Sequence, residues 1–144
     1  MCTFDRLPYF HTDTTVDRVL QQLLRSATSY GIDILAYCFM PDHLHALIAG
    51  ASFDADAKAY LTFFRQSSGV AHRATVGSRL WQEGYFDRHL RDSDATQDVV
   101  SYIVCNPVRA RLCVLVESYR WSGSSVYRLK DIVRDVQWRP EPLG

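Results

Sequence analysis

The sequence predicts an α+β fold of the ferredoxin-like, split βαβ kind, and three observations lead to this prediction. The chain has 144 residues, 47% of them hydrophobic and 22% charged, which suits one globular domain. Apolar residues recur at helical spacing in some segments and form continuous or alternating runs in others. The resulting order is strand, helix, strand, strand, helix, strand, and then one appended helix. We expect an antiparallel sheet with helices on one face only, in a domain over residues 1–137 with a loose tail at 138–144.

The first half of the chain supplies four of these elements. Residues 2–10 are short and apolar and predict an edge strand. Residues 14–30 predict an amphipathic helix that begins at capping residues 12–14 and ends at Gly31. Residues 32–40 are a continuous apolar run and residues 43–49 alternate, so they predict two strands of a hairpin that turns at Pro41-Asp42.

The second half supplies the other three. Residues 55–74 predict a helix, and the aromatic-rich residues 80–91 predict a further full strand. Asp94, followed by Gln97 three residues later, resembles a capping box that opens the last helix. That helix is expected to reach Cys105 and to be closed by Asn106-Pro107.

Charge and cysteine usage constrain the class of protein. The net charge is zero, but residues 1–64 hold 4 basic and 7 acidic side chains, whereas 65–139 hold 12 and 8. A basic second half permits a nucleic-acid partner without requiring one. None of the four cysteines has the C-x-x-C spacing of a zinc site. With no long apolar run and no signal peptide, we expect a cytoplasmic protein without a membrane partner.

His43-Leu44-His45 is the sharpest local feature. Side chains alternate along a strand, so both imidazoles should share one face while Leu44 faces the core. Such a pair suits two ligands of one metal ion, but an isolated H-x-H is more often two histidines that merely share a face. Zinc takes three or four protein ligands, whereas magnesium and manganese tolerate water.

Two further groups of residues could carry chemistry. Tyr102 and Asn106 are four residues apart, so a helix would place them on one face. In one interpretation Tyr102 is a nucleophile and Asn106 an oxygen ligand of a metal ion. In the other, Tyr102 is a core residue and Asn106 caps the helix. Aromatic and basic side chains also alternate along residues 80–91, a pattern that suits base stacking and phosphate contact or simply a packed strand.

Together these segments resemble one family, the single-tyrosine HUH transposases. Residues 36–48 resemble its histidine motif, residues 81–88 its aromatic strand, and residues 101–110 its tyrosine motif. The last of these, with residues 119–124, resembles the branch associated with repetitive extragenic palindromes. The chain departs from the family at Asp42, where Asn is common, and at Arg111, where the branch has Gly.

The resemblance implies a DNA strand transferase that works through a covalent 5′-phosphotyrosine. It implies Tyr102 as nucleophile, with His43, His45 and Asn106 as ligands of Mg²⁺ or Mn²⁺. The expected partner is single-stranded or hairpin DNA, with a homodimer also open. The expected DNA contacts are Arg65, Trp81, Gln82, Arg88, Arg91 and Arg109. Two alternatives stay open: a host-retained domain that binds hairpin DNA without cutting it, and an unrelated metal-dependent phosphodiesterase.

Overall fold

The computed structural model describes residues 1–91 and 95–135. The predicted cap Asp94 and the predicted tail therefore lie outside the described residues. The helices are α1 (Asp13–Ser29), α2 (Ala57–Val76), α3 (Thr96–Val104), α4 (Asn106–Arg109) and α5 (Leu129–Asp135), and the strands are β1 (Ile32–Met40), β2 (His43–Gly50) and β3 (Ser122–Gly123). Three 3₁₀ turns lie at Phe4–Arg6, Tyr9–His11 and Val116–Ser118. The α+β class, the hairpin and both long helices are confirmed.

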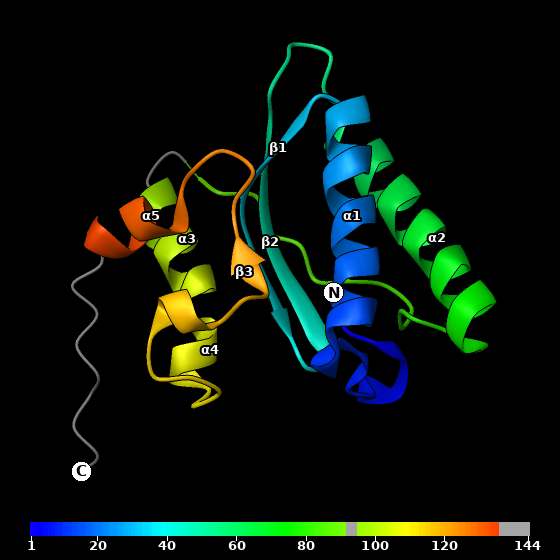
Figure 1. Cartoon of the computed structure of the whole chain (residues 1–144). Coiled ribbons are helices and arrows are strands. Elements are labelled where there is room, and N and C mark those ends of the chain that lie inside the picture. Colours follow the sequence, from blue (N-terminus) through cyan, green and yellow to red (C-terminus); the bar gives the residue numbers. More distant parts are fainter. Residues whose placement is uncertain (92–94, 136–144) are drawn as a thin grey trace.

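The sheet is antiparallel, in the order β2-β1-β3, and helices cover both of its faces. Helices α1 and α2 lie on one side of the sheet, and α3, α4 and α5 lie on the other (Figure 1). The prediction of helices on one face only is therefore wrong. The tyrosine helix is also not the last element, because α4, β3 and α5 follow it.

A β-bulge in the central strand explains why both faces need cover. Ile34 pairs with Ile48 and Ala36 pairs with Leu47, so Leu35 is an extra residue in β1. Before the bulge, Ile34 packs into the core beneath α1 and α2. After it, Ala36 and two further alternate residues pack into a second core with α3 and α4. An apolar strand buried on both faces requires a layer on each side.

The two predicted outer strands are reduced to single-residue bridges. Cys2 forms a β-bridge with His43 of β2, and Thr3 forms one with Trp81. The first segment therefore lies between β2 and Trp81. The first segment turns away at Asp5 and Arg6, which both have positive φ. The predicted strand at residues 80–91 stops after Trp81, and Gly84 at φ 69° bends the following segment.

The strand β3 was missed in the sequence because it is two residues long. The residues just before it are tied to β1 by long-range hydrogen bonds: the Tyr119 hydroxyl donates to the Phe39 carbonyl at 2.5 Å, and the Phe39 N–H donates to the Trp121 carbonyl at 2.9 Å. Gly123 lies against Tyr37, where an added Cβ would stand 2.8 Å from the tyrosine oxygen. The segment that resembles a family motif thus completes the sheet.

Candidate active site

His43 and His45 open β2 and share the sheet face that carries the second core. Leu44 between them is buried in the first core, as the alternation predicts. The two Nε2 atoms are 3.1 Å apart, and the rings meet edge to face at 4.7 Å. Helix α3 packs on this face against β1 and β2 of the same chain (Figure 1). The predicted pair is therefore formed within a packed layer rather than on an open sheet face.

Asp42 anchors the pair from one side. His43 Nδ1 donates to Asp42 Oδ1 at 2.7 Å, and Arg6 Nε donates to Asp42 Oδ2 at 3.0 Å. Burial acts to raise the pKa of Asp42, but the hydrogen bond from His43 and the charge of Arg6 outweigh it, so the pKa lies below its usual value. The carboxylate is therefore ionised at neutral pH and acts only as an acceptor.

His45 is held in its neutral form. Burial is the largest cause, and electrostatic interactions with His43, the amino terminus and Arg109 add to it, so the pKa of His45 is lowered to about 4. A neutral imidazole is the form that binds a metal ion.

The spacing of the two nitrogens fits a small divalent ion. Two ligand atoms at about 2.1 Å from one ion and about 90° apart are about 3 Å from each other, as in octahedral coordination. Within residues 1–91 and 95–135, no third His, Cys, Asp or Glu joins the pair. The other coordination positions of a bound ion would be filled by an amide oxygen, by water or by the substrate. Magnesium and manganese accept such oxygen ligands.

Tyr102 lies on α3 with 59% of its surface exposed, so most of the residue is open to solvent. Asn106 was predicted to close that helix, but in the structure it begins α4. Pro107 lies in the first turn of α4, where a missing N–H is tolerated. Cys105 between the helices keeps a helical backbone (φ −83°, ψ −6°). Tyr102 and Asn106 therefore remain four residues apart along a nearly continuous helical path.

Arg109 contacts Tyr102 and acts electrostatically on His45. Its guanidinium carbon lies 3.9 Å from the centre of the Tyr102 ring, and its Nη2 donates to the Tyr102 carbonyl at 2.6 Å. Its charge also contributes to the lowered pKa of His45. A cation therefore lies beside the exposed phenol and within electrostatic reach of the histidine pair.

Trp81 does not have the exposed position that was predicted for base stacking. It is 5% exposed, its ring packs against Phe10 and Phe64, and its Nε1 donates to Ser68 Oγ at 2.9 Å. The indole belongs to the core.

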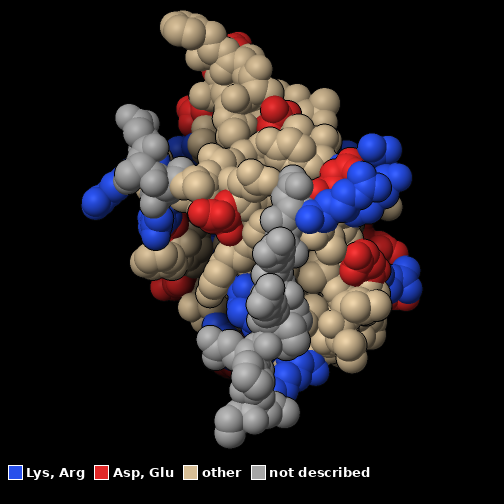
Figure 2. Space-filling model, turned by 90° about the vertical axis from the view of Figure 1, so that its left-hand side faces the viewer, with Lys and Arg blue, Asp and Glu red and all other residues tan. Residues whose placement is uncertain are grey.

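The other predicted DNA contacts lie nearer the surface. Arg65 Nη2 donates to the Gln82 carbonyl at 2.6 Å, and its guanidinium carbon lies 5.0 Å from the Tyr85 ring centre. Gln82, Arg88 and Arg91 are exposed on the segment that follows Trp81. On the side of α3 and α5, basic side chains form separate groups with acidic ones between them (Figure 2).

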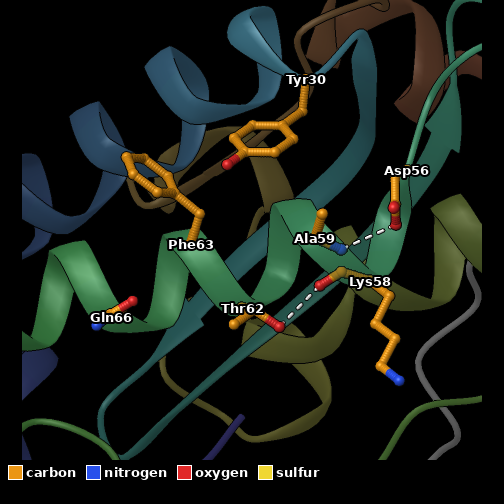
Figure 3. Close-up of a pocket in the computed structure, with 7 residues that line it drawn as sticks. All are labelled: Tyr30, Asp56, Lys58, Ala59, Thr62, Phe63 and Gln66. Carbon is orange, nitrogen blue, oxygen red and sulfur yellow. Dashed lines mark hydrogen bonds between the residues drawn. The ribbon is translucent and has the colours of Figure 1, made fainter.

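A surface pocket lies between the end of α1 and the start of α2, apart from these residues. Tyr30 and Phe63 face each other across it at 5.6 Å, and Asp56 caps α2 by accepting from the Ala59 N–H at 2.9 Å (Figure 3). None of the predicted site residues lines it.

Sequence reasoning missed the roles of Asp42 and Arg6 beside the histidines. The available signal was an acidic residue immediately before the His-x-His motif, at a position where the family commonly has Asn. Arg6 could not be found this way, because it reaches Asp42 across 36 positions of sequence.

Comparison with known proteins places these features in a family. The family model described as "Transposase IS200 like" matches residues 1–106. A solved structure, that of a REP-associated tyrosine transposase bound to a REP hairpin, is similar with a TM-score of 0.64 and 18% sequence identity. The match covers 76% of this chain and 65% of that one, so the chain spans just under two thirds of that protein's length.

A search of curated proteins gave no significant match. Among the described residues, no helix combines the length and hydropathy needed to span a bilayer. The family model covers well over half of the sequence and includes the histidine pair, Tyr102 and Asn106. The chain therefore belongs to the IS200-like transposase family.

Proposed function

We propose that this protein cleaves and rejoins single-stranded DNA through a covalent bond to Tyr102. One observation carries the proposal: Tyr102 is exposed on α3, and α3 covers the sheet on which the imidazoles of His43 and His45 meet. A nucleophile and a phosphate-activating site in one layer suit phosphoryl transfer.

In the proposed step, the Tyr102 hydroxyl gives its proton to water and its oxygen attacks the scissile phosphorus. A bond forms between that oxygen and phosphorus, and the bond from phosphorus to the 3′ oxygen breaks. The 3′ oxygen leaves and takes up a proton, so the products are a 5′-phosphotyrosine and a free 3′ hydroxyl. A phenol with pKa near 10 leaves more readily than an alkoxide, so a second 3′ hydroxyl can reverse the step without ATP.

His43, His45 and Asn106 are the proposed ligands of Mg²⁺ or Mn²⁺. When bound, the ion would neutralise and orient the scissile phosphate. The protein's own part is to hold the His45 imidazole neutral and facing that of His43, and to keep Tyr102 on a helix packed against the same sheet. Arg109 supplies a second positive charge beside the phenol.

Hairpin DNA is the proposed substrate. The fold is shared with a tyrosine transposase whose structure contains a REP hairpin. Exposed Arg88 and Arg91, together with Arg65 and Gln82, are proposed to contact the DNA backbone or bases. A single strand beside a hairpin is flexible and exposes its bases for stacking, whereas a fully paired duplex is stiffer and keeps its bases paired.

The test uses oligonucleotides that carry a hairpin and a single-stranded flank taken from the DNA around the gene. Labelling the 3′ end reports the covalent product, because the 5′-phosphotyrosine remains on the 3′ fragment. With Mn²⁺, we expect a labelled protein band that resists denaturation, no such band for Tyr102→Phe, and none from a fully paired duplex of the same sequence.

Tyr127→Phe is the matched control, because Tyr127 is also exposed and lies outside the proposed site. It should form the adduct like the wild type. Hairpin binding without any adduct in the wild type would replace the proposal with a non-catalytic hairpin-binding domain. An adduct that survives in Tyr102→Phe would assign the nucleophile elsewhere.

A further inference from the structure

Asp42, in the turn of the hairpin, accepts hydrogen bonds at both its backbone carbonyl and its side-chain carboxylate. Its carbonyl accepts from the Thr3 N–H at 2.9 Å and from the Thr3 hydroxyl at 3.0 Å. One carboxylate oxygen accepts from Arg6 at 3.0 Å, and the other accepts from His43 at 2.7 Å. The N-terminal segment thus fixes both the backbone and the side chain of Asp42, which aims one oxygen at the His43 ring.

This arrangement determines where the protons of the histidine pair lie. An ionised carboxylate only accepts, so His43 must donate from Nδ1, and the Nε2 of its neutral ring then carries a lone pair. In the metal-free protein the 3.1 Å contact between the two Nε2 atoms then makes His45 the donor, and this ring must move its proton to Nδ1 before its Nε2 can bind an ion. His43 therefore presents an unprotonated nitrogen toward the site before any ion arrives.

We propose that Asp42 is a positioning residue that fixes the tautomer of His43 and raises the affinity of the histidine pair for a divalent cation. The inference rests on the proposed metal site at His43 and His45. A carboxylate behind a ligating imidazole orients the ring and makes its free nitrogen a stronger donor, and loss of such a partner typically weakens metal binding by 10- to 100-fold.

Asn at this position, common in the family, would act differently. Its amide oxygen accepts the same hydrogen bond but brings no charge, and a flipped amide would donate to the ring and favour the opposite tautomer. Asp42→Asn therefore separates the charge from the hydrogen bond, whereas Asp42→Ala removes both. Asp17→Asn, on the exposed face of α1, is the control for the change in net charge.

Two measurements test the proposal. Nitrogen-15 spectra of the histidine rings in the metal-free protein report the tautomer, and calorimetric titration with Mn²⁺ reports affinity. We expect His43 protonated at Nδ1 in the wild type, a mixture of tautomers in Asp42→Asn and loss of the preference in Asp42→Ala. Mn²⁺ affinity should fall about 10-fold in Asp42→Asn and up to about 100-fold in Asp42→Ala, with Asp17→Asn unchanged.

The outcomes separate this inference from the function on which it rests. A wild-type His43 protonated at Nε2, or equal Mn²⁺ affinity in the wild type and folded Asp42→Asn, would overturn the positioning role. A wild type that binds no Mn²⁺ would overturn the affinity claim and the proposed metal site together, whereas the spectra would still judge the tautomer. If Asp42→Ala does not fold, the near-isosteric Asp42→Asn decides alone.

Discussion

At the scale of single residues, His72 stands out because it is fully buried and unpaired. Neither ring nitrogen has a hydrogen-bond partner within the described part of the chain, and the Tyr9 ring packs edge-on at 4.6 Å. Burial, with a smaller effect from Arg18, lowers the pKa of His72 below its usual value. The folded state therefore disfavours the charged ring.

This burial makes stability depend on pH. Below about pH 6.5 the unfolded chain protonates His72 while the folded chain resists, so the unfolded state binds more protons and stability falls as pH drops. We expect the free energy of unfolding to decrease between pH 7 and 5, and His72→Phe to remove part of that decrease. Urea denaturation across this range measures it, with exposed His89→Gln as control. An unchanged slope in His72→Phe would contradict the assignment.

Arg109 gives a second prediction at this scale. Its guanidinium lies against the Tyr102 ring and its positive charge acts on His45, so it could meet the scissile phosphate if the proposed function holds. Removing one charged donor to a developing phosphate charge typically lowers a rate by about 100-fold. We expect that loss in single-turnover cleavage by Arg109→Gln, and a smaller loss for Arg109→Lys, which keeps the charge but not the planar fork.

The control for this prediction is Arg73→Gln, which removes an exposed arginine from the last turn of α2. It should change cleavage little. If Arg109→Gln weakens hairpin binding as much as it slows cleavage, Arg109 contributes to general DNA affinity, and the predicted role beside the phosphate is wrong.

At the scale of elements, local patterns were sufficient for the hairpin and the two long helices. The alternation around Leu44 predicts a strand, and the helical spacing before Gly31 predicts a helix. Both patterns depend on residues only a few positions apart. The layers could not be found this way. The extra residue Leu35 changes which β1 side chains share a face, and the resulting second core collects residues from α3 onward.

The same distinction applies to the candidate site. His43, His45, Tyr102 and Asn106 were found because motif spacing is local. The core position of Trp81 and the contact from Arg6 to Asp42 depend on segments far apart in sequence. The apolar run of β1 did carry a usable signal, since a strand buried on both faces needs helices on both sides.

Ser125 offers a test of how the bulge in β1 is held. Its hydroxyl accepts from the Ile34 N–H at 2.9 Å, and its own N–H donates to the Ile34 carbonyl at 2.8 Å. Ser125→Ala keeps the second bond but leaves the Ile34 N–H without its partner. We expect a loss of about 1–3 kcal/mol in the free energy of unfolding, measured by chemical denaturation.

Ser29→Ala is the comparison, because the Ser29 hydroxyl donates to the Arg25 carbonyl at an exposed helix end. Its effect should stay within about 0.5 kcal/mol. Equal effects of the two substitutions would mean that Ser125 does not stabilise the bulge.

At the scale of the whole molecule, the three-layer arrangement relates the tyrosine to the histidines. The sheet separates α1 and α2 from α3, α4 and α5, and the chain crosses between the layers after α2 (Figure 1). Helix α3 then packs on β1 and β2 of its own chain, and Arg109 contacts Tyr102 while its charge reaches His45 of the same chain. A site made of one helix and one sheet can assemble within one chain, or across a homodimer that exchanges the helix.

This packing predicts assembly within one chain, and mixing two inactive variants tests it. Tyr102→Phe keeps the histidines, and His43→Ala keeps the tyrosine. If each chain builds its own site, an equimolar mixture, unfolded and refolded together to allow exchange, should cleave no more than either variant alone. If the site is shared across a dimer, half of the dimers are mixed and each holds one intact site, so cleavage should return to about a quarter of the wild-type level. Wild type refolded with the Tyr102→Phe, His43→Ala double variant shows that active chains survive the procedure. Recovery near a quarter would place Tyr102 in the partner's site and contradict the packing of α3 on its own sheet.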